Sequence, residues 1–391
     1  MILLLGGFSL KVLITTDFYK PNTNGVVRSV MTLKSALEQQ GHEVRVLTLN
    51  QTGIVRENDV YILRSISAGK IYPNARIMFG MCRSVVNKIV KWKPDIIHSQ
   101  CEFSTFFFAN RIAKKLRIPL VHTYHTVYED YTHYFSPSHT IGKEIVETLS
   151  RKILKHTQAI IAPTEKVKDI LTSYKVKPPI TVIPTGLDLQ KCSSPVDKNT
   201  LSEMKHSLGI PEDNTVLLFL GRLAREKNID ETIKLIENCH LNKFTFLIVG
   251  DGPDRDRLEK HVKKSSIKNN VIFTGLVPMD SVNAYYQLAD LFICSSTSEA
   301  QGLTYFEALA NGVPALCRKD ACLDGVLINY KNGFAEFLNF FFSDKCNRED
   351  MIANALPVKD KFSSKAFGEN VAELYKNTIK KFNEKNSVNY K

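Results

Sequence analysis

The chain has 391 residues, of which 43% are hydrophobic and 24% are charged. This composition is typical of a globular protein with apolar cores and excludes an intrinsically disordered one. The length exceeds that of one ordinary domain and predicts two domains of about 150–200 residues each. The apolar runs fall short of the ~18–20 residues that a membrane-spanning helix needs, so we expect no such helix.

The formal net charge of +12 is distributed unevenly along the chain. Residues 1–186 carry 25 Lys and Arg against 13 Asp and Glu, which accounts for the whole excess, whereas residues 187–391 carry 27 of each kind. A basic half of this kind suits nucleic acid, an anionic membrane or a phosphate-bearing ligand. Nucleic acid is the weakest of these, because the sequence has no helix-turn-helix, zinc-finger or RNP-like motif.

The eight cysteines are scattered and form no C-x-x-C motif. We interpret them as reduced thiols of a cytosolic protein rather than as a disulfide or zinc framework. The apolar start at residues 1–10 has no preceding basic residue and no small-residue cleavage site, which disfavours a signal peptide. We expect these residues to extend the first strand or to reflect a start codon assigned slightly upstream.

Strand-like runs alternate with amphipathic helical segments along the whole chain, which predicts parallel α/β sheets. A helix is expected over residues 26–40, ending at Gly41, and another over the tail at 362–382. The crossover between the halves is expected near residues 183–199. The predicted strands are 11–16, 43–49, 95–99, 119–124, 159–162 and 180–183 in the first half, and 215–220, 244–249, 271–273, 291–294 and 313–317 in the second.

The first candidate motif is the turn after the opening strand, where Pro21, Asn22, Asn24 and Gly25 break the chain before a helix. Small residues at a helix N-terminus let backbone amides approach a phosphate. An ordinary βα turn would give the same pattern. The turn lacks a full G-x-G-x-x-G motif, so it does not indicate NAD binding.

The second motif places Arg222 and Lys227 between a predicted strand and the helix that follows it. Ligands of open α/β sheets bind at the carboxyl ends of the strands, which is where these two cations would lie. Arg and Lys suit a pyrophosphate, and Arg can contact it through two nitrogens. The alternative is that both are solvated loop charges, which is the usual fate of such residues.

The third motif follows the predicted strand at 291–294 and contains Glu299, Gly302, Leu303, Thr304 and Glu307. The amides at residues 302–304 would lie at the mouth of a helix, where they could hold phosphate. Carboxylates on either side could accept hydrogen bonds from sugar and ribose hydroxyls. Glu299 could instead merely complement the helix dipole, whereas Glu307 lies among apolar residues and needs a partner.

Together these motifs resemble those of family-4 retaining glycosyltransferases with the GT-B fold. One departure is Asn228, where the family usually has Gly, and it puts the conformation of that turn in question. The matching pieces cover nearly the whole chain: Pro21, Asn24 and Gly25; the run at 183–188; Gly221, Arg222, Glu226 and Lys227; the runs at 249–253 and 273–275, the latter ending at Gly275; and the pair Glu299 and Glu307.

The segment at residues 121–135 carries a narrower resemblance. It holds four tyrosines and three histidines and is similar to the His-Thr-x-Tyr-Glu-Asp-Tyr stretch of bacterial diacylglycerol glucosyltransferases. In that family the residue matching His125 lies beside the transferred sugar, and we expect Tyr128 to lie at the acceptor site. The alternative is that these aromatic rings pack a cleft and that the other histidines are incidental.

The resemblance implies two Rossmann-like domains that face each other across a cleft. Residues 1–186 would bind the acceptor and residues 187–365 the nucleotide sugar. Residues 366–391 would form a helix that packs back on the N-terminal domain. The donor would be a UDP-sugar, UDP-glucose first of all, with no obligatory cofactor and no metal.

The resemblance also implies roles for the site residues. Arg222, Lys227 and the amides near Gly25 and at 302–304 would stabilise the departing diphosphate, so catalysis would be chiefly electrostatic. Glu299 would hold sugar hydroxyls, Glu307 the ribose, and His125 would orient the sugar. We therefore predict a hexosyltransferase with a lipid acceptor, diacylglycerol first of all. The alternatives are a family member with another acceptor, such as a preformed glycolipid, a polyprenyl-linked sugar or a polysaccharide, or a nucleotide-sugar-binding protein without turnover.

A lipid acceptor would place the protein in the cytoplasm, peripherally bound to the inner face of the cell membrane. The stretch at 104–117 combines apolar bulk at Phe106 with the cations Arg111, Lys114 and Lys115, and residues 76–91 form a second basic amphipathic stretch. Each cation near an anionic surface contributes about 1 kcal/mol. The alternative is a helix whose apolar face packs on the sheet while its cations are solvated.

Overall fold

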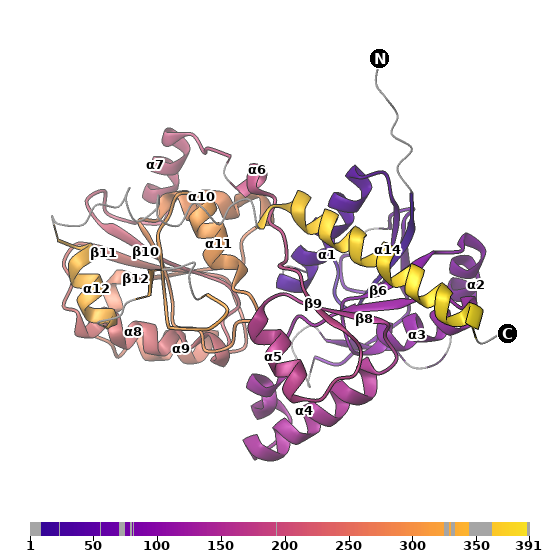
Figure 1. The fold of residues 1–391 in the computed structure, drawn as a ribbon. Coiled ribbons are helices and arrows are strands. Elements are labelled where there is room, and N and C mark those ends of the chain that lie inside the picture. Colours follow the sequence, from indigo (N-terminus) through magenta and orange to yellow (C-terminus); the bar gives the residue numbers. More distant parts are fainter. Residues whose placement is uncertain are drawn as a thin grey trace. The chain divides into compact units, whose positions relative to one another are not determined.

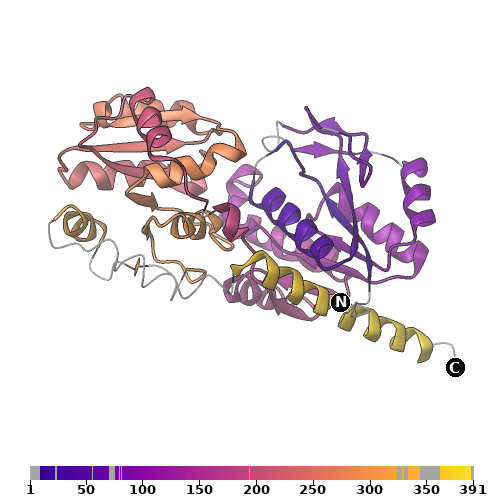
Figure 2. The same ribbon diagram turned by 90° about the horizontal axis from the view of Figure 1, so that it is seen from above.

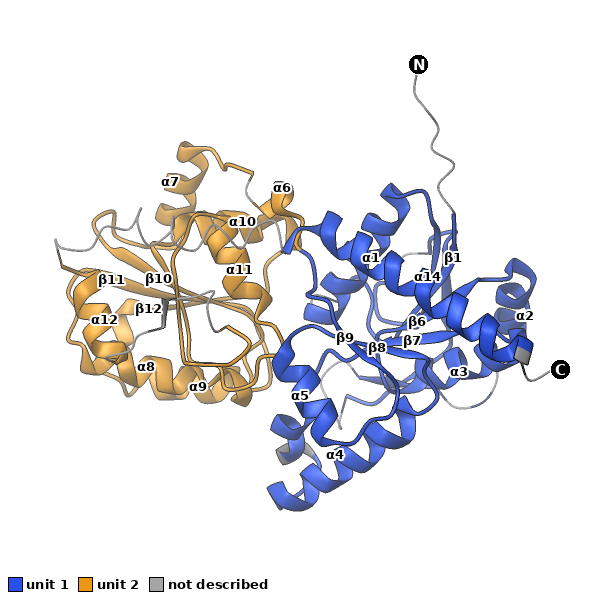
Figure 3. Cartoon of the chain, viewed as in Figure 1, with its two compact units in different colours: residues 1–186, 361–391 blue, residues 187–360 orange. Residues whose placement is uncertain are grey.

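The computed structural model describes residues 9–388 except 23, 55, 70–74, 79, 81, 193, 324–327, 330–332 and 344–361. The expectation for the start of the chain concerns residues 1–8, which lie outside the described residues. The chain divides into two compact units (Figure 3). Unit 1 comprises residues 1–186 and 361–391, and unit 2 comprises residues 187–360.

Unit 1 is built on a seven-stranded sheet with the order β3-β2-β1-β6-β7-β8-β9. All its strand pairs are parallel. The central strands are buried at nearly every position, as expected for a parallel sheet covered by helices on both faces. The strands are β1 (Lys11–Thr16), β2 (Glu43–Leu49), β3 (Val60–Leu63), β6 (Ile96–Ser99), β7 (Leu120–Thr123), β8 (Ala159–Ala162) and β9 (Ile180–Val182), and a separate antiparallel pair is formed by β4 (Ile66–Ser67) and β5 (Arg76–Ile77).

Two apolar cores lie on opposite faces of this sheet. Successive strand residues point to opposite sides, so Val12 and Ile14 enter one core and Leu13 enters the other. Helices α1 (Gly25–Gln39) and α14 (Ser364–Val388) complete the first core, and α2 (Arg83–Trp92) and α3 (Ser104–Leu116) complete the second. The remaining helices of unit 1 are η1 (Tyr128–Tyr134), α4 (His139–Leu154) and α5 (Glu165–Ser173).

The long C-terminal helix α14 packs beside α1 within unit 1 (Figures 1 and 2). Its residues Phe367, Val371 and Tyr375 are buried in the core on that face of the sheet. The Tyr375 hydroxyl lies 2.6 Å from Nδ1 of the buried His98, whose Nε2 lies 2.7 Å from the hydroxyl of Thr123. Burial lowers the pKa of His98 well below its usual value, so the imidazole is neutral and both its nitrogens are satisfied by hydroxyl groups.

The Tyr375→Phe substitution is expected to lower the free energy of unfolding of unit 1 by about 1–3 kcal/mol, because it leaves a buried ring nitrogen without a partner. Chemical denaturation followed by circular dichroism measures this change. Tyr61→Phe is the matched control, since its half-buried hydroxyl accepts a bond from Arg45 near the surface and water can replace it. Equal losses in the two variants would contradict the expectation.

Unit 2 is built on a second parallel sheet with the order β12-β11-β10-β13-β14-β15. Its strands are β10 (Thr215–Leu220), β11 (Phe244–Val249), β12 (Val271–Gly275), β13 (Leu291–Cys294), β14 (Ala315–Cys317) and β15 (Ile328–Asn329). Its helices are α6 (Leu189–Cys192), α7 (Lys198–Ser207), η2 (Arg225–Lys227), α8 (Ile229–Asn238), α9 (Arg255–Val262), η3 (Lys268–Asn270), η4 (Met279–Ser281), α10 (Val282–Leu288), α11 (Leu303–Ala310) and α12 (Phe334–Phe341).

The eleven strands expected from the sequence are all present, with ends shifted by at most two residues. Helix α1 ends at Gln39, and Gly41 follows with a φ of 84°, in agreement with the predicted helix end. The expectation missed β3 and the two-residue strands β4, β5 and β15. These are edge or very short elements, for which the alternation of the sequence carries little information.

Candidate active site

The strand order reverses in both sheets beside the first strand of each unit. In unit 2 the reversal falls between the neighbours β10 and β13, and in unit 1 it falls between β1 and β6. Loops that leave two such strands go to opposite sides of the sheet, which opens a crevice at their carboxyl ends. In unit 2 these loops carry Arg222 and Lys227 after β10, and Glu299 and Gly302 after β13.

Lys227 and Glu299 form an ion pair that joins the two loops of unit 2. The Nζ atom of Lys227 lies 2.6 Å from Oε1 of Glu299. The two side chains are 21% and 10% exposed, so the pair is largely shielded from water but remains partly accessible. An ammonium group held in this way is already partly desolvated and oriented, so it needs little reorganisation when an anionic ligand binds.

Arg222 is held by Glu226, a residue of the family-matching motif for which the sequence predicted no role. Its guanidinium donates to Oε1 of Glu226, a residue that is only 4% exposed. The backbone carbonyl of Glu226 also accepts a bond from the amide of Thr297, 3.2 Å away, on the loop after β13. The i,i+4 spacing of Arg222 and Glu226 could not have predicted this support, because residues 221–224 are not helical and the contact depends on how the loop folds.

Asn228 adopts a left-handed conformation with a φ of 52° between η2 and α8. This explains why a Gly is usual at this position, and Asn is among the residues that tolerate the conformation best. Asn228 therefore forms the turn in which the family usually has Gly.

Glycines let the backbone loops approach closely at the end of the unit 2 sheet. A Cβ on Gly250 would lie 2.0 Å from the carbonyl oxygen of Gly221, so no larger residue fits there. The amide of Gly250 donates to the carbonyl of Gly275 over 3.0 Å, which gives Gly275 a structural role at this edge.

Helix α11 presents its N-terminus at the same edge. Gly302 precedes it with a φ of 76°, and no side chain caps the helix. The amides of Leu303 and Thr304 lie in its first turn. This arrangement is suited to an anion, because unsatisfied amides and the positive end of the helix dipole act together.

Glu307 lies one turn further along α11 and is 1% exposed. The hydroxyl of Tyr286, on α10, donates to its Oε2 atom over 3.0 Å and also lies 3.2 Å from the carbonyl oxygen of Thr304. The partner that a carboxylate in apolar surroundings requires is therefore a buried tyrosine. This contact fixes the position of Glu307 relative to the first turn of the helix.

In unit 1, His125 is paired with Gln100, which follows β6. The Nε2 atom of His125 lies 2.7 Å from Oε1 of Gln100, which can only accept, so His125 donates from Nε2. Burial, and secondly the nearby His122, lower the pKa of His125 to about 3. The ring is therefore neutral at physiological pH and offers Nδ1 as an acceptor.

A second buried group at this edge supports Tyr128. Glu102 accepts a bond from the Tyr128 hydroxyl over 2.5 Å and lies 3.0 Å from Nε2 of His122. Burial, and secondly the charge of Glu102, raise the pKa of Tyr128 well above its usual value, so the hydroxyl stays protonated. Sequence reasoning missed Gln100 and Glu102, although both are polar residues within three positions of the end of the buried strand β6.

Unmatched polar atoms gather at the same edge. The Nε2 atom of Gln100 and Nδ1 of His122 are buried and have no hydrogen-bond partner among the described residues. Asp17, after β1, accepts a bond from the Thr105 amide over 2.9 Å at the start of α3. Burial raises the pKa of Asp17 to about 7, so this carboxyl is partly protonated near neutral pH and can donate a hydrogen bond.

Asn24 and Gly25 begin helix α1 in unit 1. The side-chain oxygen of Asn24 accepts the amide of Val27 over 2.9 Å, so it caps the helix rather than being available to a ligand. The space beside the Gly25 α-carbon is open, since a Cβ at this position would have no atom within 4 Å. Any ligand of this turn would therefore contact its backbone amides.

The N-terminal part of the chain, residues 23–191, matches the model of the family described as Glycosyltransferase Family 4, and residues 202–339 match that of Glycosyl transferases group 1. The chain is 37% identical over 316 residues to the alpha-monoglucosyldiacylglycerol synthase of Streptococcus pneumoniae, covering 80% of this chain and 72% of that one. It is 34% identical to the enzyme of the same name from Acholeplasma laidlawii, covering 83% and 84%. The chain belongs to glycosyltransferase family 4.

The fold of this glycosyltransferase matches solved structures over most of its length. The Anabaena protein Alr3699/HepE, crystallised in complex with UDP and glucose, superimposes with a TM-score of 0.73 at 18% identity, covering 94% of this chain and all of that one. The two Rossmann-like sheets and this likeness confirm the predicted GT-B fold. The protein is a nucleotide-sugar-dependent glycosyltransferase, as predicted.

The side chains expected at a membrane are distributed differently in the folded glycosyltransferase. Phe106 is 1% exposed and packs in the core beneath α3, so the expectation that it contacts the membrane is wrong. Arg111, Lys114 and Lys115 lie on the exposed side of the same helix. The periodicity of an amphipathic helix does not say which of its apolar residues faces the sheet, and here the sheet covers Phe106.

Among the residues that the structure describes, no helix of the glycosyltransferase has both the length and the apolar character needed to cross a membrane. Over the same residues, no cluster of three or more His, Cys, Asp or Glu side chains is arranged to hold a metal ion.

Proposed function

We propose that this glycosyltransferase transfers glucose from UDP-glucose to the free hydroxyl of diacylglycerol and retains the anomeric configuration. The observation that carries the proposal is the 37% and 34% identity with two alpha-monoglucosyldiacylglycerol synthases. A solved relative of the same fold binds UDP-glucose, which supports the choice of donor. The proposed configuration follows from the family resemblance.

We assign the donor to unit 2. The diphosphate would meet the amides at the start of α11 together with Arg222 and Lys227, which neutralise the charge that develops as the sugar leaves. Glu299, placed by Lys227 2.6 Å away, would accept hydrogen bonds from the sugar hydroxyls. Glu307, held by Tyr286, would accept those of the ribose.

We assign the acceptor to unit 1, together with groups that orient the sugar. The neutral His125 would accept a hydrogen bond at Nδ1, since its Nε2 is engaged by Gln100. Tyr128, fixed by Glu102, would border the acceptor hydroxyl, and the amides near Gly25 would contribute to the phosphate site. Transfer would thus depend on positioning and electrostatics rather than on a covalent intermediate.

Direct assay tests the proposal. The purified protein is incubated with radiolabelled UDP-glucose, UDP-galactose or GDP-mannose and with diacylglycerol, glucosyldiacylglycerol or a polyprenyl-linked sugar in mixed micelles. We expect label in monoglucosyldiacylglycerol from UDP-glucose, with an α-anomeric proton signal in the NMR spectrum. Transfer only to a preformed glycolipid or to the polyprenyl acceptor would show that diacylglycerol is not the acceptor. Transfer only from another donor would show that UDP-glucose is not the donor.

We further propose that the protein docks peripherally on the membrane through α4 of unit 1. Ile141, Ile145 and Leu149 recur every four residues on this helix and are 56%, 41% and 50% exposed. The exposed cation Lys152 lies on the same side of the helix, as in interfacial helices on anionic lipid, whereas Lys143 is paired with Glu129 over 2.9 Å. The η1 segment that carries Tyr128 packs against α4, so the acceptor residue and the apolar stripe are connected.

Replacing Ile141 and Leu149 together by Ser is expected to weaken binding to anionic vesicles at least tenfold, because each large apolar side chain contributes about 1.5–3 kcal/mol when it leaves water. Vesicle sedimentation measures the loss, and added salt should weaken wild-type binding further. Leu276→Ser, at a 72% exposed position in unit 2, is the matched control. Unchanged binding of the double variant would reject α4 as the docking element.

A further inference from the structure

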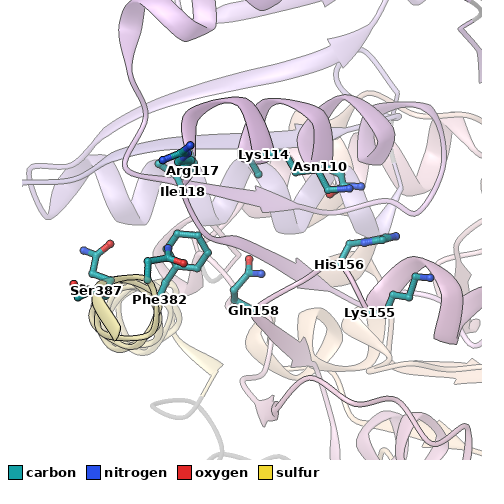
Figure 4. Close-up of a pocket in the computed structure, with 12 residues that line it drawn as sticks. Asn110, Lys114, Arg117, Ile118, Lys155, His156, Gln158, Phe382 and Ser387 are labelled. Atoms are coloured by element: carbon teal, nitrogen blue, oxygen red, sulfur yellow. Dashed lines mark hydrogen bonds between the residues drawn. The ribbon is translucent and has the colours of Figure 1, made fainter. Parts of the chain in front are cut away.

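Unit 1 contains a pocket of about 920 Å³ that the proposed transfer does not use. Its walls come from the end of α3, from the segment between α4 and β8, and from the last turns of α14 (Figure 4). Arg117 and Ile118 precede β7 and Gln158 precedes β8. The pocket therefore lies at the edge where these parallel strands begin, whereas Gln100 and His125 follow strands at the edge where they end.

The pocket is lined by basic groups without acidic ones. Lys114, Arg117, Lys155 and His156 are among its twelve lining residues, and none of the twelve is Asp or Glu. Within the described part of the chain, Lys114 and Lys155 form no ion pair. Burial lowers the pKa of His156, and the charges of Lys114 and Lys155 lower it further, so both ammonium groups act on this side chain.

Helix dipoles offset part of this positive charge. Helices α3, α4 and α14 end at Leu116, Leu154 and Val388, beside the pocket, and each C-terminus carries the equivalent of about −0.5 charge. Three such ends offset about half of the charge of the three permanent cations. A net charge of about +1.5 remains, which is opposite in sign to the charge of −1.5 to −2 that a phosphate monoester carries near neutral pH and of similar size.

Neutral groups of the pocket are also suited to a phosphate ester. Asn383 and Asn386 of α14 supply side-chain amide donors, and Phe382 forms an apolar wall. The Ser387 hydroxyl donates to the carbonyl of Asn383 over 2.9 Å and can offer a ligand only its acceptor lone pairs. The side-chain oxygen of Gln158 accepts the Leu120 amide over 2.7 Å, so its amide nitrogen is the atom left for a ligand. Figure 4 shows Phe382 and Ser387 on α14, with Lys114 on α3 and Arg117 directly after that helix across from them.

We propose that this pocket binds a phosphate-type anion, either the headgroup of a membrane phospholipid or a free phosphate ester. The bound anion would bridge α3, the end of α4 and α14, and would thereby stabilise the docking of the C-terminal helix on unit 1. The inference does not depend on the proposed transfer reaction, because the pocket and the transfer site occupy opposite edges of the sheet.

The test uses the full chain and the double variant Lys114→Glu with Lys155→Glu. Lys177→Glu with Lys264→Glu is the control, since it changes the overall charge equally at exposed positions away from the pocket. Inorganic phosphate and glycerol phosphate are titrated at constant ionic strength, with the His156 signal followed by NMR and the Tm followed by calorimetry. Vesicles of phosphatidylcholine with and without 30% phosphatidylglycerol form the lipid arm.

We expect the anion to raise the pKa of His156 in the wild type and in the control, and the pocket variant to bind at least fivefold more weakly. Saturation by glycerol phosphate identifies a free ester, and a response only to phosphatidylglycerol vesicles identifies a lipid headgroup. An unchanged His156 titration in the wild type with all of these probes would overturn the proposal. So would equal binding by the pocket and control variants.

Discussion

Substitution of Lys227 by Ala is expected to lower kcat for glucose transfer by about 10²–10³-fold, the effect of removing one preorganised donor from a developing negative charge. The ammonium is held 2.6 Å from Glu299 at the carboxyl ends of β10 and β13, where we place the departing diphosphate. Because its interaction strengthens as the sugar–phosphate bond breaks, kcat should fall much more than the affinity for UDP-glucose. Steady-state kinetics over a range of donor concentrations separates the two effects.

Three further measurements make this result specific. Lys264→Ala removes an exposed lysine of unit 2 and should leave kcat unchanged. Thermal unfolding must show that the Lys227 variant is folded, because Glu299 is only 10% exposed and loses its ion pair with Lys227. Glu299→Gln, alone and combined with Lys227→Ala, completes a double-mutant cycle that measures the coupling of the pair. A near-wild-type kcat in the folded Lys227 variant would remove this residue from the mechanism.

Substitution of Glu307 by Gln is expected to raise KM for UDP-glucose by about 10–100-fold with a smaller change in kcat. A hydrogen bond to a charged acceptor contributes about 1.5–3 kcal/mol, and the ribose would lose this interaction in the ground state and the transition state alike. Isothermal titration with UDP measures the same loss without turnover.

Tyr286→Phe provides the companion variant, because it removes the hydroxyl that donates to Glu307 and keeps the carboxylate. If Glu307 binds the ribose, the Tyr286 variant should bind UDP more tightly than the Glu307 variant and more weakly than the wild type. If Glu307 only stabilises the α10–α11 contact, both variants should lose stability and bind UDP equally well. That second outcome would assign Glu307 to the fold alone.

The sequence alone determined the α/β class, nearly all long strands and the places where ligand-binding loops occur. These features are local. A buried parallel strand is a short apolar run, and a helix start is marked by residues such as Asn24 that cap it. The motifs around Arg222, Lys227 and Glu299 could be recognised because their spacing along the chain is itself the signal.

The tertiary structure decided which of these side chains meet. The Tyr375 hydroxyl reaches His98 across 277 positions of sequence, and Lys227 reaches Glu299 across 72. Glu102 supports Tyr128 and Gln100 supports His125 only because β6 and β7 are neighbours in the sheet. No local pattern encodes these pairings, since they depend on strand order.

Burial was likewise decided by the fold. The amphipathic pattern of residues 104–117 is compatible with either a membrane or a sheet beneath the helix, and the sheet covers Phe106. On α4 the same kind of pattern leaves Ile141, Ile145 and Leu149 exposed. Periodicity determines that a helix has an apolar face, but what covers that face depends on the packing of elements distant in sequence.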